Sequence, residues 1–418
     1  MTTPSDSQRN QRISLTEAFF SSFMIGSAEA FFSAYALSKG MGEILSGMIA
    51  GLPLMMGALL QLWTPSLFTR LGRPRLWVLL TAAAQLFCLL LLGLTSRVGD
   101  AGPWTIFLLI GLYWAFSFAG GTVWNYWMGH VVPAQDLGAF FPKRLRITQY
   151  GIIAGLLLAG SFLNTQGHSV TAGPQMYLYP FGLAFLVRLI STFLLSRQTD
   201  MPLENVQSRG PDPRAFLRET WALFQQQVQV RRDFAFLFLF NITIYISSSF
   251  ATPFLLAKLK FDYLSYMAAV MALYLGKILS LLLAQKWIRK IGVRRILFWG
   301  ALGMSPLPAF WILTRHTLDA VLLQALSGFF WGFFEVAVGM LLFAELPTRD
   351  KVRLLTWYNL FQTSAILLGT LIGAKILASC EETIFGYFLI FAVGSGLRTL
   401  LVIIQREKII GPTDQKLR

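Results

Sequence analysis

Charged residues are scarce in this sequence. They make up 13% of its 418 residues, about half the share found in an ordinary soluble domain. Cysteine is almost absent: Cys88 and Cys380 lie within apolar runs, so neither a disulfide framework nor a redox pair is expected. The three histidines, His130, His168 and His316, lie far apart in the sequence, which argues against a metal site.

Several short motifs with known chemistry are also missing. No glycine–lysine–serine phosphate loop occurs, so ATP hydrolysis is not expected. The paired-histidine zinc helix and the serine nucleophile elbow are absent as well. These absences favour a protein that is not an enzyme and needs no cofactor or metal. A membrane transferase built on unfamiliar carboxylates remains a minor alternative.

Apolar residues dominate what is present. They form 55% of the chain, with 36 Phe and 12 Trp. A soluble protein of this composition would expose large apolar patches and tend to aggregate. Two sets of apolar runs are each long enough to cross a bilayer: 13–38, 41–66, 76–97, 103–130, 145–165 and 175–196, then 234–256, 263–286, 295–314, 318–345, 354–379 and 383–405. The runs lack strand alternation. We therefore expect an all-α integral membrane protein with twelve transmembrane helices.

The distribution of basic residues predicts the orientation of these helices. The net charge of +15 could indicate nucleic-acid binding, but the basic residues cluster in short loops on one side of the apolar runs. Arg70, Arg73 and Arg75 form one such cluster. The opposite side holds only a few basic residues: Lys39, Arg97, Lys258, Lys260, Arg315 and Lys375. This asymmetry predicts a multi-pass protein of the inner (cytoplasmic) membrane with both termini in the cytoplasm and no nucleic-acid partner.

A long basic segment divides the chain into two halves. Within it, Asp212 and Pro213 are suited to start a helix with Phe216, Trp221 and Phe224 on one face. We expect this helix to lie along the inner membrane surface, the alternative being a loosely ordered linker. The predicted organisation is a cytoplasmic tail, a six-helix bundle, this linker, a second six-helix bundle and a second tail: 1–12, 13–196, 197–233, 234–405 and 406–418.

The two halves carry matching features, which indicates a parallel duplication. "RLGRPRLWVLL" (70–80) follows the second apolar run and "KIGVRRILFWG" (290–300) follows the eighth. "PAQD" (133–136) and "PTRD" (347–350) follow the fourth and tenth runs. Arg188 and Arg398 occupy matching places in the last run of each half. Repeated halves are a known build of transporters that alternate around a midplane site.

The loop after the second run resembles the basic signature of the major facilitator superfamily. The matching residues are Arg70, Gly72, Arg73 and Arg75, and its copy in the second half keeps Lys290, Gly292 and Arg294. The sequence departs from the signature at Pro65, Thr69 and Arg289. "PAQDLGAFFPKR" also resembles a loop in a poorly characterised bacterial branch of that family. The resemblance implies two pseudo-symmetric six-helix bundles in which the first, fourth, seventh and tenth spans surround a central cavity.

Two carboxylates lie deep within predicted spans, Glu29 in the first and Glu335 in the tenth. An ionised group at mid-bilayer costs at least ~2.5 kcal/mol, so such residues usually face a cavity or a partner. Lys277 in the eighth run is a further deep charge. We hypothesise that Glu29, Glu335 and Lys277 couple protons or substrate to transport, with Lys277 pairing with Glu335 in one state only. The alternative is a permanent structural ion pair.

Polar and aromatic residues recur at helical spacing in four spans and predict a substrate-binding surface. Ser22, Glu29 and Ser33 share a predicted face of the first span. The other candidates lie in the fourth, seventh and tenth spans: Tyr113, Trp124 and Asn125, then Asn241, Tyr245 and Ser248, then Trp331. Trp127 is a further aromatic candidate, although most tryptophans in such a chain pack or face lipid.

These features predict a secondary active transporter. We expect a monomer that moves a small, amphipathic organic solute by alternating access, coupled to protons and in contact with membrane lipid. A lipid flippase or scramblase on the same fold is the alternative, which would be favoured by a lateral opening lined by Arg188 or Arg398. Both arginines otherwise serve a structural role.

Overall fold

The computed structural model describes residues 4–98, 102–166, 173–200, 225, 228–344 and 351–410. Every regular element in these ranges is a helix, as the apolar runs predict, because a helix satisfies its backbone polar groups within one segment. Eleven segments of the described chain are long and apolar enough to cross a membrane. The amphipathic helix expected around residues 212–228 falls largely outside the described residues.

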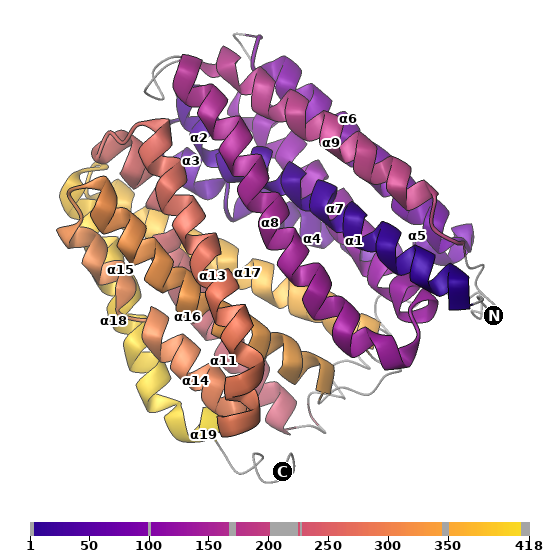
Figure 1. Ribbon diagram of the computed structural model, residues 1–418. Coiled ribbons are helices and arrows are strands. Elements are labelled where there is room, and N and C mark those ends of the chain that lie inside the picture. Colours follow the sequence, from indigo (N-terminus) through magenta and orange to yellow (C-terminus); the bar gives the residue numbers. More distant parts are fainter. Residues whose placement is uncertain are drawn as a thin grey trace. The chain divides into compact units, whose positions relative to one another are not determined.

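The chain forms two compact units (Figure 1). Unit 1 comprises Met1–Lys39 and Leu52–Arg218, and unit 2 comprises Gly40–Gly51 and Glu219–Arg418. The described helices of unit 1 are α1 (Pro4–Ser27), η1 (Glu29–Phe31), α2 (Phe32–Ser38), α4 (Leu52–Leu60), η2 (Gln61–Trp63), α5 (Thr64–Leu71), α6 (Pro74–Thr95), α7 (Pro103–Val131), α8 (Ala134–Gln166), η4 (Pro174–Tyr177) and α9 (Leu178–Ser196).

Unit 2 contains the second set of spans. Its described helices are α3 (Gly42–Met48), α11 (Val228–Ser248), α12 (Ala251–Pro253), the π-helical turn η5 (Phe254–Lys258), α13 (Tyr263–Ile291), α14 (Val293–Met304), α15 (Leu307–Phe310), η6 (Trp311–Leu313), α16 (Thr317–Ala344), α17 (Lys351–Ser379), α18 (Ile384–Ile404) and α19 (Arg406–Ile410).

The first predicted span is not among the eleven apolar segments. Its helix α1 begins at Pro4, inside the expected tail, and carries Glu17 together with many serines. It ends at Ser27, and a single 3-10 turn at Glu29–Phe31 separates it from α2. The polar residues lower the hydropathy of this segment, and the turn places Glu29 at an interruption of the helix rather than within a regular one.

The duplication is visible in the packing of each unit (Figure 1). In unit 1, α1 packs against α8 and α9, α6 against α7 and α9, and α4 against α7. In unit 2, the helices at matching positions repeat this scheme: α11 packs against α17 and α18, α14 against α16 and α18, and α13 against α16. The two halves therefore share one internal architecture.

The second predicted span is divided between the units. The expected first bundle included all of 13–196, whereas the contacts of Gly40–Gly51 lie in unit 2. There Glu43 Oε1 lies 2.8 Å from Lys258 Nζ, and the Tyr387 hydroxyl donates a hydrogen bond to Glu43 Oε2 at 2.8 Å. The other part of the span, α4, packs on α7 in unit 1.

Glycines allow the closest helix contacts within each unit. A side chain at Gly151 or Gly155 on α8 would collide with the backbone of α1. A side chain at Gly369 or Gly373 would collide with the backbone of α11. Both glycine pairs therefore lie at tight helix contacts inside their own units.

Replacing Gly276 with Ala tests this packing. A Cβ atom at Gly276 on α13 would collide with the Ala325 carbonyl oxygen on α16, and overpacking of this kind costs about 2 kcal/mol. We expect the apparent Tm of the purified protein in detergent to fall by roughly 4–8 °C. Gly396→Ala is the matched control, because no atom lies within 4 Å of a Cβ built there. Equal Tm values for the two variants would contradict the close α13–α16 contact.

Candidate functional site

Glu29 contacts the fourth predicted span inside unit 1. The hydroxyl of Tyr113 on α7 donates a hydrogen bond to Glu29 Oε1 at 2.5 Å. Tyr113 is fully buried, whereas Glu29 is partly exposed. Two of the predicted site residues are therefore brought together at the break between α1 and α2.

A second carboxylate, Glu17 on α1, lies at the centre of a buried polar cluster. Arg144 on α8 donates to Glu17 Oε2 at 2.8 Å, and Ser191 on α9 donates to Glu17 Oε1 at 2.9 Å. Arg188 Nη1 lies 3.8 Å from Glu17 Oε1 and donates to the Ser191 hydroxyl at 3.0 Å. The Glu17 side chain is only 4% exposed. A charge buried to this degree needs partners, and the guanidinium groups of Arg144 and Arg188 provide them.

Gln85 links this cluster to the Glu29 site. Arg188 Nη2 donates to Gln85 Oε1 at 2.6 Å, and the Gln85 amide donates to the backbone oxygen of Tyr113 at 3.4 Å. A continuous series of polar contacts thus runs from Glu17 on α1 through α9 and α6 to Tyr113 and Glu29. Arg188 also lies within electrostatic reach of Glu29.

Trp124 on α7 stacks on Arg144, whose guanidinium carbon lies 3.9 Å from the ring centroid. This is a cation–π contact and occupies one face of the ring. Asn125 is exposed and donates to the Gly121 carbonyl of its own helix. Trp127 is 1% exposed and donates to the Thr199 carbonyl, so it belongs to the packed core rather than to a ligand surface.

The predicted stripe on the first span is not one continuous face. Ser22 is 1% exposed, donates to the Ala18 carbonyl and packs against Gly151 of α8. Ser33 is partly exposed but lies beyond the turn that ends α1. Ser22 therefore does not share an accessible face with Glu29 in this structure, because its side chain is enclosed between α1 and α8.

Glu335 and Lys277 form an ion pair in unit 2. Lys277 Nζ on α13 lies 2.9 Å from Glu335 Oε2 on α16. The Glu335 side chain is 47% exposed, whereas that of Lys277 is 15% exposed. The carboxylate therefore stands at the accessible edge of the pair.

Aromatic rings surround this ion pair. Lys277 Nζ lies 5.5 Å from the ring centroid of Trp331 and 5.9 Å from that of Tyr274, distances at which a cation is attracted to an aromatic face. Tyr245 on α11 and Tyr358 on α17 lie within electrostatic reach of Glu335. Four helices of unit 2 thus contribute to one charged, ring-lined surface.

The three candidate residues of the seventh predicted span differ in their exposure. Tyr245 is partly exposed and Ser248 is exposed. Asn241 is 3% exposed, and its amide donates to the Leu237 carbonyl of its own helix at 2.8 Å. The expectation that Asn241 contacts a substrate is not met in this conformation, because its side chain is enclosed between helices.

Arg188 and Arg398 hold equivalent positions but have different partners. Arg398 is 4% exposed and donates to the backbone oxygens of Met304, Thr243 and Ile244. It joins α18 to α14 and α11, as Arg188 joins α9 to α6 and α1. Both side chains turn into their own unit rather than line an opening.

The loop residues of the family signature are mainly structural. Gly72 ends α5 with φ 68°, a left-handed conformation that favours glycine. Arg70, Arg73 and Lys290 are exposed, and Gly292 has φ 87°. Arg75 lies 3.8 Å from Asp200, whereas Arg294 is 2% exposed and binds both carboxylate oxygens of Asp233, at 3.0 and 2.9 Å.

Sequence reasoning missed the Glu17 cluster. Glu17 lies near the start of the expected first span, 13–38, whereas α1 begins at Pro4 and places Glu17 well inside a helix. Arg144 lies just before the expected span 145–165, whereas α8 begins at Ala134 and positions Arg144 against Glu17. The signal for Gln85 in the sequence was weak, because it is a single uncharged polar residue within the apolar run 76–97.

Comparisons with known proteins agree with this architecture. The family model described as Major Facilitator Superfamily matches residues 122–370, more than half of the chain. No curated protein sequence matches the chain.

Solved structures share the fold at low sequence identity. A mutant of the nucleoside transporter NupG is 13% identical, with a TM-score of 0.72 over 95% of this chain and 99% of that one. The xylose transporter XylE from E. coli is 14% identical, with a TM-score of 0.64 over 96% and 98%. The E. coli fucose:proton symporter FucP is 12% identical, with a TM-score of 0.61 over 96% and 99%.

Proposed function

The chain belongs to the Major Facilitator Superfamily, and we propose that it is a proton-coupled secondary transporter of a small organic solute. It works by alternating access, exposing its binding site to each side of the membrane in turn. We further propose that it acts as a monomer in the inner membrane. Both termini lie in the cytoplasm in this proposal, because the basic residues cluster on the side of the termini.

The Lys277–Glu335 pair is the observation that carries this proposal. A carboxylate on a membrane-crossing helix is stabilised by one lysine at 2.9 Å while 47% of its side chain stays accessible. Protonation of Glu335 would remove the attraction to Lys277 and leave a buried ammonium group without its counter-charge. The two protonation states therefore favour different arrangements of α13 and α16, and a proton gradient can shift the balance between them.

Glu29 and the polar contacts behind it support a second coupling site in unit 1. Tyr113 donates to Glu29, and Gln85, Arg188 and Glu17 continue the series across the unit. A change of charge at Glu29 alters the electrostatic potential at Arg188, and therefore the balance of contacts that joins α9 to α1 and α6. Glu29 and Glu335 thus have the same kind of role in separate units.

The rings near Glu335 indicate the class of solute. Trp331, Tyr274 and Tyr245 offer faces that stack on a planar or cyclic molecule, and the ion pair offers donors and acceptors to hydroxyl or amine groups. Structural neighbours are named as transporters of nucleosides, xylose and fucose. Nucleosides and simple sugars are therefore the first compounds to test, followed by amphipathic amines and organic anions.

A transport assay in liposomes tests the proposal. The purified full-length chain is reconstituted, and each radiolabelled compound is offered with and without an imposed pH difference of one unit. One proton per solute would support about tenfold accumulation across that difference. We expect at least one of these compounds to accumulate only when the pH difference is present. Transport that is indifferent to pH, or movement of labelled phospholipid alone, would contradict the proposal.

A further inference from the structure

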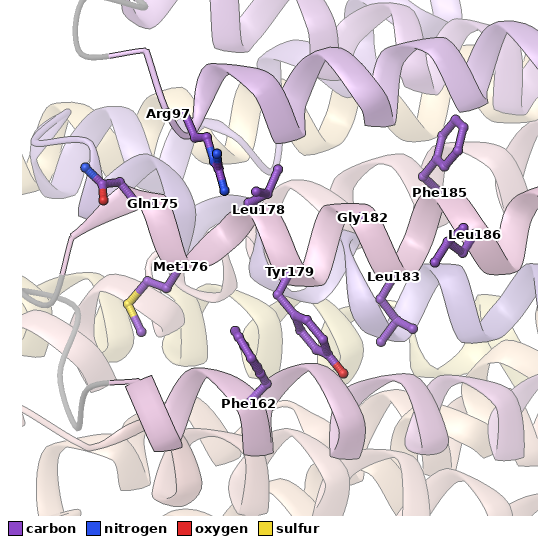
Figure 2. A pocket seen from close by; sticks show the side chains of 10 residues that line it. All are labelled: Arg97, Phe162, Gln175, Met176, Leu178, Tyr179, Gly182, Leu183, Phe185 and Leu186. Atoms are coloured by element: carbon purple, nitrogen blue, oxygen red, sulfur yellow. The ribbon is translucent and has the colours of Figure 1, made fainter.

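A groove of about 770 Å³ opens on unit 1, away from the polar cluster described above. Its walls come from Arg97 just beyond α6, from Phe162 on α8 and from residues of η4 and α9. Figure 2 shows the lining side chains spread along α9, with Arg97 and Gln175 at one end and Phe185 and Leu186 toward the other. The groove is thus polar at one end and apolar along its length.

The apolar part of the groove is open to the membrane. Leu186 is 57% exposed, and the same face of α9 continues with Leu189, Ile190 and Phe193, all exposed. On the other side, Phe162 of α8 stacks on Tyr179 with ring centroids 3.7 Å apart. In a membrane-crossing helix such a face contacts acyl chains, so the groove is continuous with the lipid surface rather than with an aqueous one.

The polar end carries positive charge. Arg97 is exposed, and among the described residues no carboxylate lies within ion-pair distance of it. Lys39 lies close by, because its ammonium group donates to the carbonyl oxygen of Val98 at 2.6 Å. Gln175 adds an exposed amide at the mouth of the groove. The two cations and the amide donor at this end of the groove are better suited to bind a phosphate group than an uncharged headgroup.

The length of the groove matches one leaflet. From Gln175 to Leu186 the chain advances about 16 Å at 1.5 Å per residue, and half of the hydrocarbon core is about 15 Å. Arg97 and Gln175 both lie where predicted spans end, which is the depth of the lipid headgroups. A phosphate at the mouth would place its acyl chain beside Leu183 and Leu186.

We propose that this groove binds one anionic phospholipid of the outer leaflet, with its phosphate at Arg97 and an acyl chain along α9. Arg97 and Gln175 hold the headgroup, while Phe162, Tyr179 and Leu186 hold the chain. The transported solute is not the occupant, because the groove contains none of the charged pairs that a coupled solute needs and opens sideways to hydrocarbon.

Two substitutions separate the two halves of this site. Arg97→Gln removes the charge at the mouth, and a cation near a membrane surface contributes enough for about a fivefold effect on affinity. Gly182→Trp fills the groove with a ring; because no atom lies within 4 Å of a Cβ at Gly182, the helix can accept the change. The matched controls are Arg315→Gln, at the same predicted side of the membrane, and Gly396→Trp, at an equally open glycine of α18.

Native mass spectrometry of the detergent-purified chain measures the binding directly. Phosphatidylglycerol and phosphatidylcholine with the same acyl chains are titrated, and adducts of one lipid are counted. We expect the wild type and both controls to retain phosphatidylglycerol preferentially, Arg97→Gln to bind it about fivefold more weakly and Gly182→Trp to lose the first adduct.

Three results would overturn the proposal. Equal binding of the two lipids would show that the headgroup charge is not recognised. Unchanged binding in Arg97→Gln and Gly182→Trp would place the lipid elsewhere. Displacement of the lipid from the wild type by a nucleoside or a simple sugar would make the groove a solute site. Size-exclusion profiles show whether Arg97→Gln or Gly182→Trp fails to fold. If one of them does, lipid binding by the other variant tests the proposal.

Discussion

Glu335→Gln is expected to abolish accumulation driven by a pH difference. Glutamine has nearly the same size as glutamate and can still accept a hydrogen bond from Lys277, which lies 2.9 Å from Glu335 in the wild type. It cannot take up or release a proton at the pH values of the assay, so the cycle can no longer be driven by protons. With a one-unit pH difference, the expected accumulation falls from about tenfold to the level seen without a gradient.

A solute-exchange assay shows whether Glu335→Gln has lost only proton coupling or has also lost its folded binding site. When labelled solute outside replaces unlabelled solute inside at equal pH, no net proton movement is needed. We expect Glu335→Gln to retain this exchange, because its site keeps its shape. Glu381→Gln is the control, since Glu381 is an exposed acid just beyond α17. Normal pH-driven accumulation in Glu335→Gln would remove Glu335 from the coupling mechanism.

Arg294→Met is expected to cause the largest loss of stability. The Arg294 side chain is 2% exposed and binds both carboxylate oxygens of Asp233. Removing one partner of a buried pair leaves the other charge uncompensated, which costs about 3–5 kcal/mol. Because Asp233 is 17% exposed, the lower value applies. The apparent Tm in detergent should fall by roughly 6–12 °C.

Two further variants test whether the uncompensated charge of Asp233 causes the loss of stability in Arg294→Met. Asp233→Asn combined with Arg294→Met removes both charges, and we expect it to be more stable than Arg294→Met alone. Arg75→Met is the matched control, because Arg75 is 37% exposed and lies 3.8 Å from Asp200; such exposed pairs contribute less than about 1 kcal/mol. A similar loss in Arg75→Met and Arg294→Met would contradict the assigned role of burial.

The order of the helices could be read from the sequence with few errors. Scarce charge and repeated apolar runs predict spans directly, because lipid accepts few ionised groups and demands helices. The low hydropathy of the first span has a physical reason. Glu17 and Glu29 lower its hydropathy, and their partners come from other helices, so the pattern of one segment could not show that the charges were satisfied.

The pairing of Lys277 with Glu335 could be hypothesised because deep charges are rare in such a chain. The Glu17–Arg144 and Arg188–Gln85 contacts could not be predicted from the sequence, because the partners are far apart in the chain and Gln85 carries no charge. Ser22 and Asn241 show the opposite error. Helical spacing placed both on a polar stripe, but short polar side chains also bond to their own helix, as both do here.

The sequence by itself determined that this chain is a duplicated, all-helical membrane protein with its basic loops on one side. Composition and periodicity carry this information, because the bilayer acts on every segment in the same way. The tertiary structure alone decided which charges meet, that Gly40–Gly51 packs in unit 2, and that Arg398 binds carbonyl groups where Arg188 approaches a carboxylate. Such contacts depend on the rotation of each helix and on the breaks within it, which no single segment encodes.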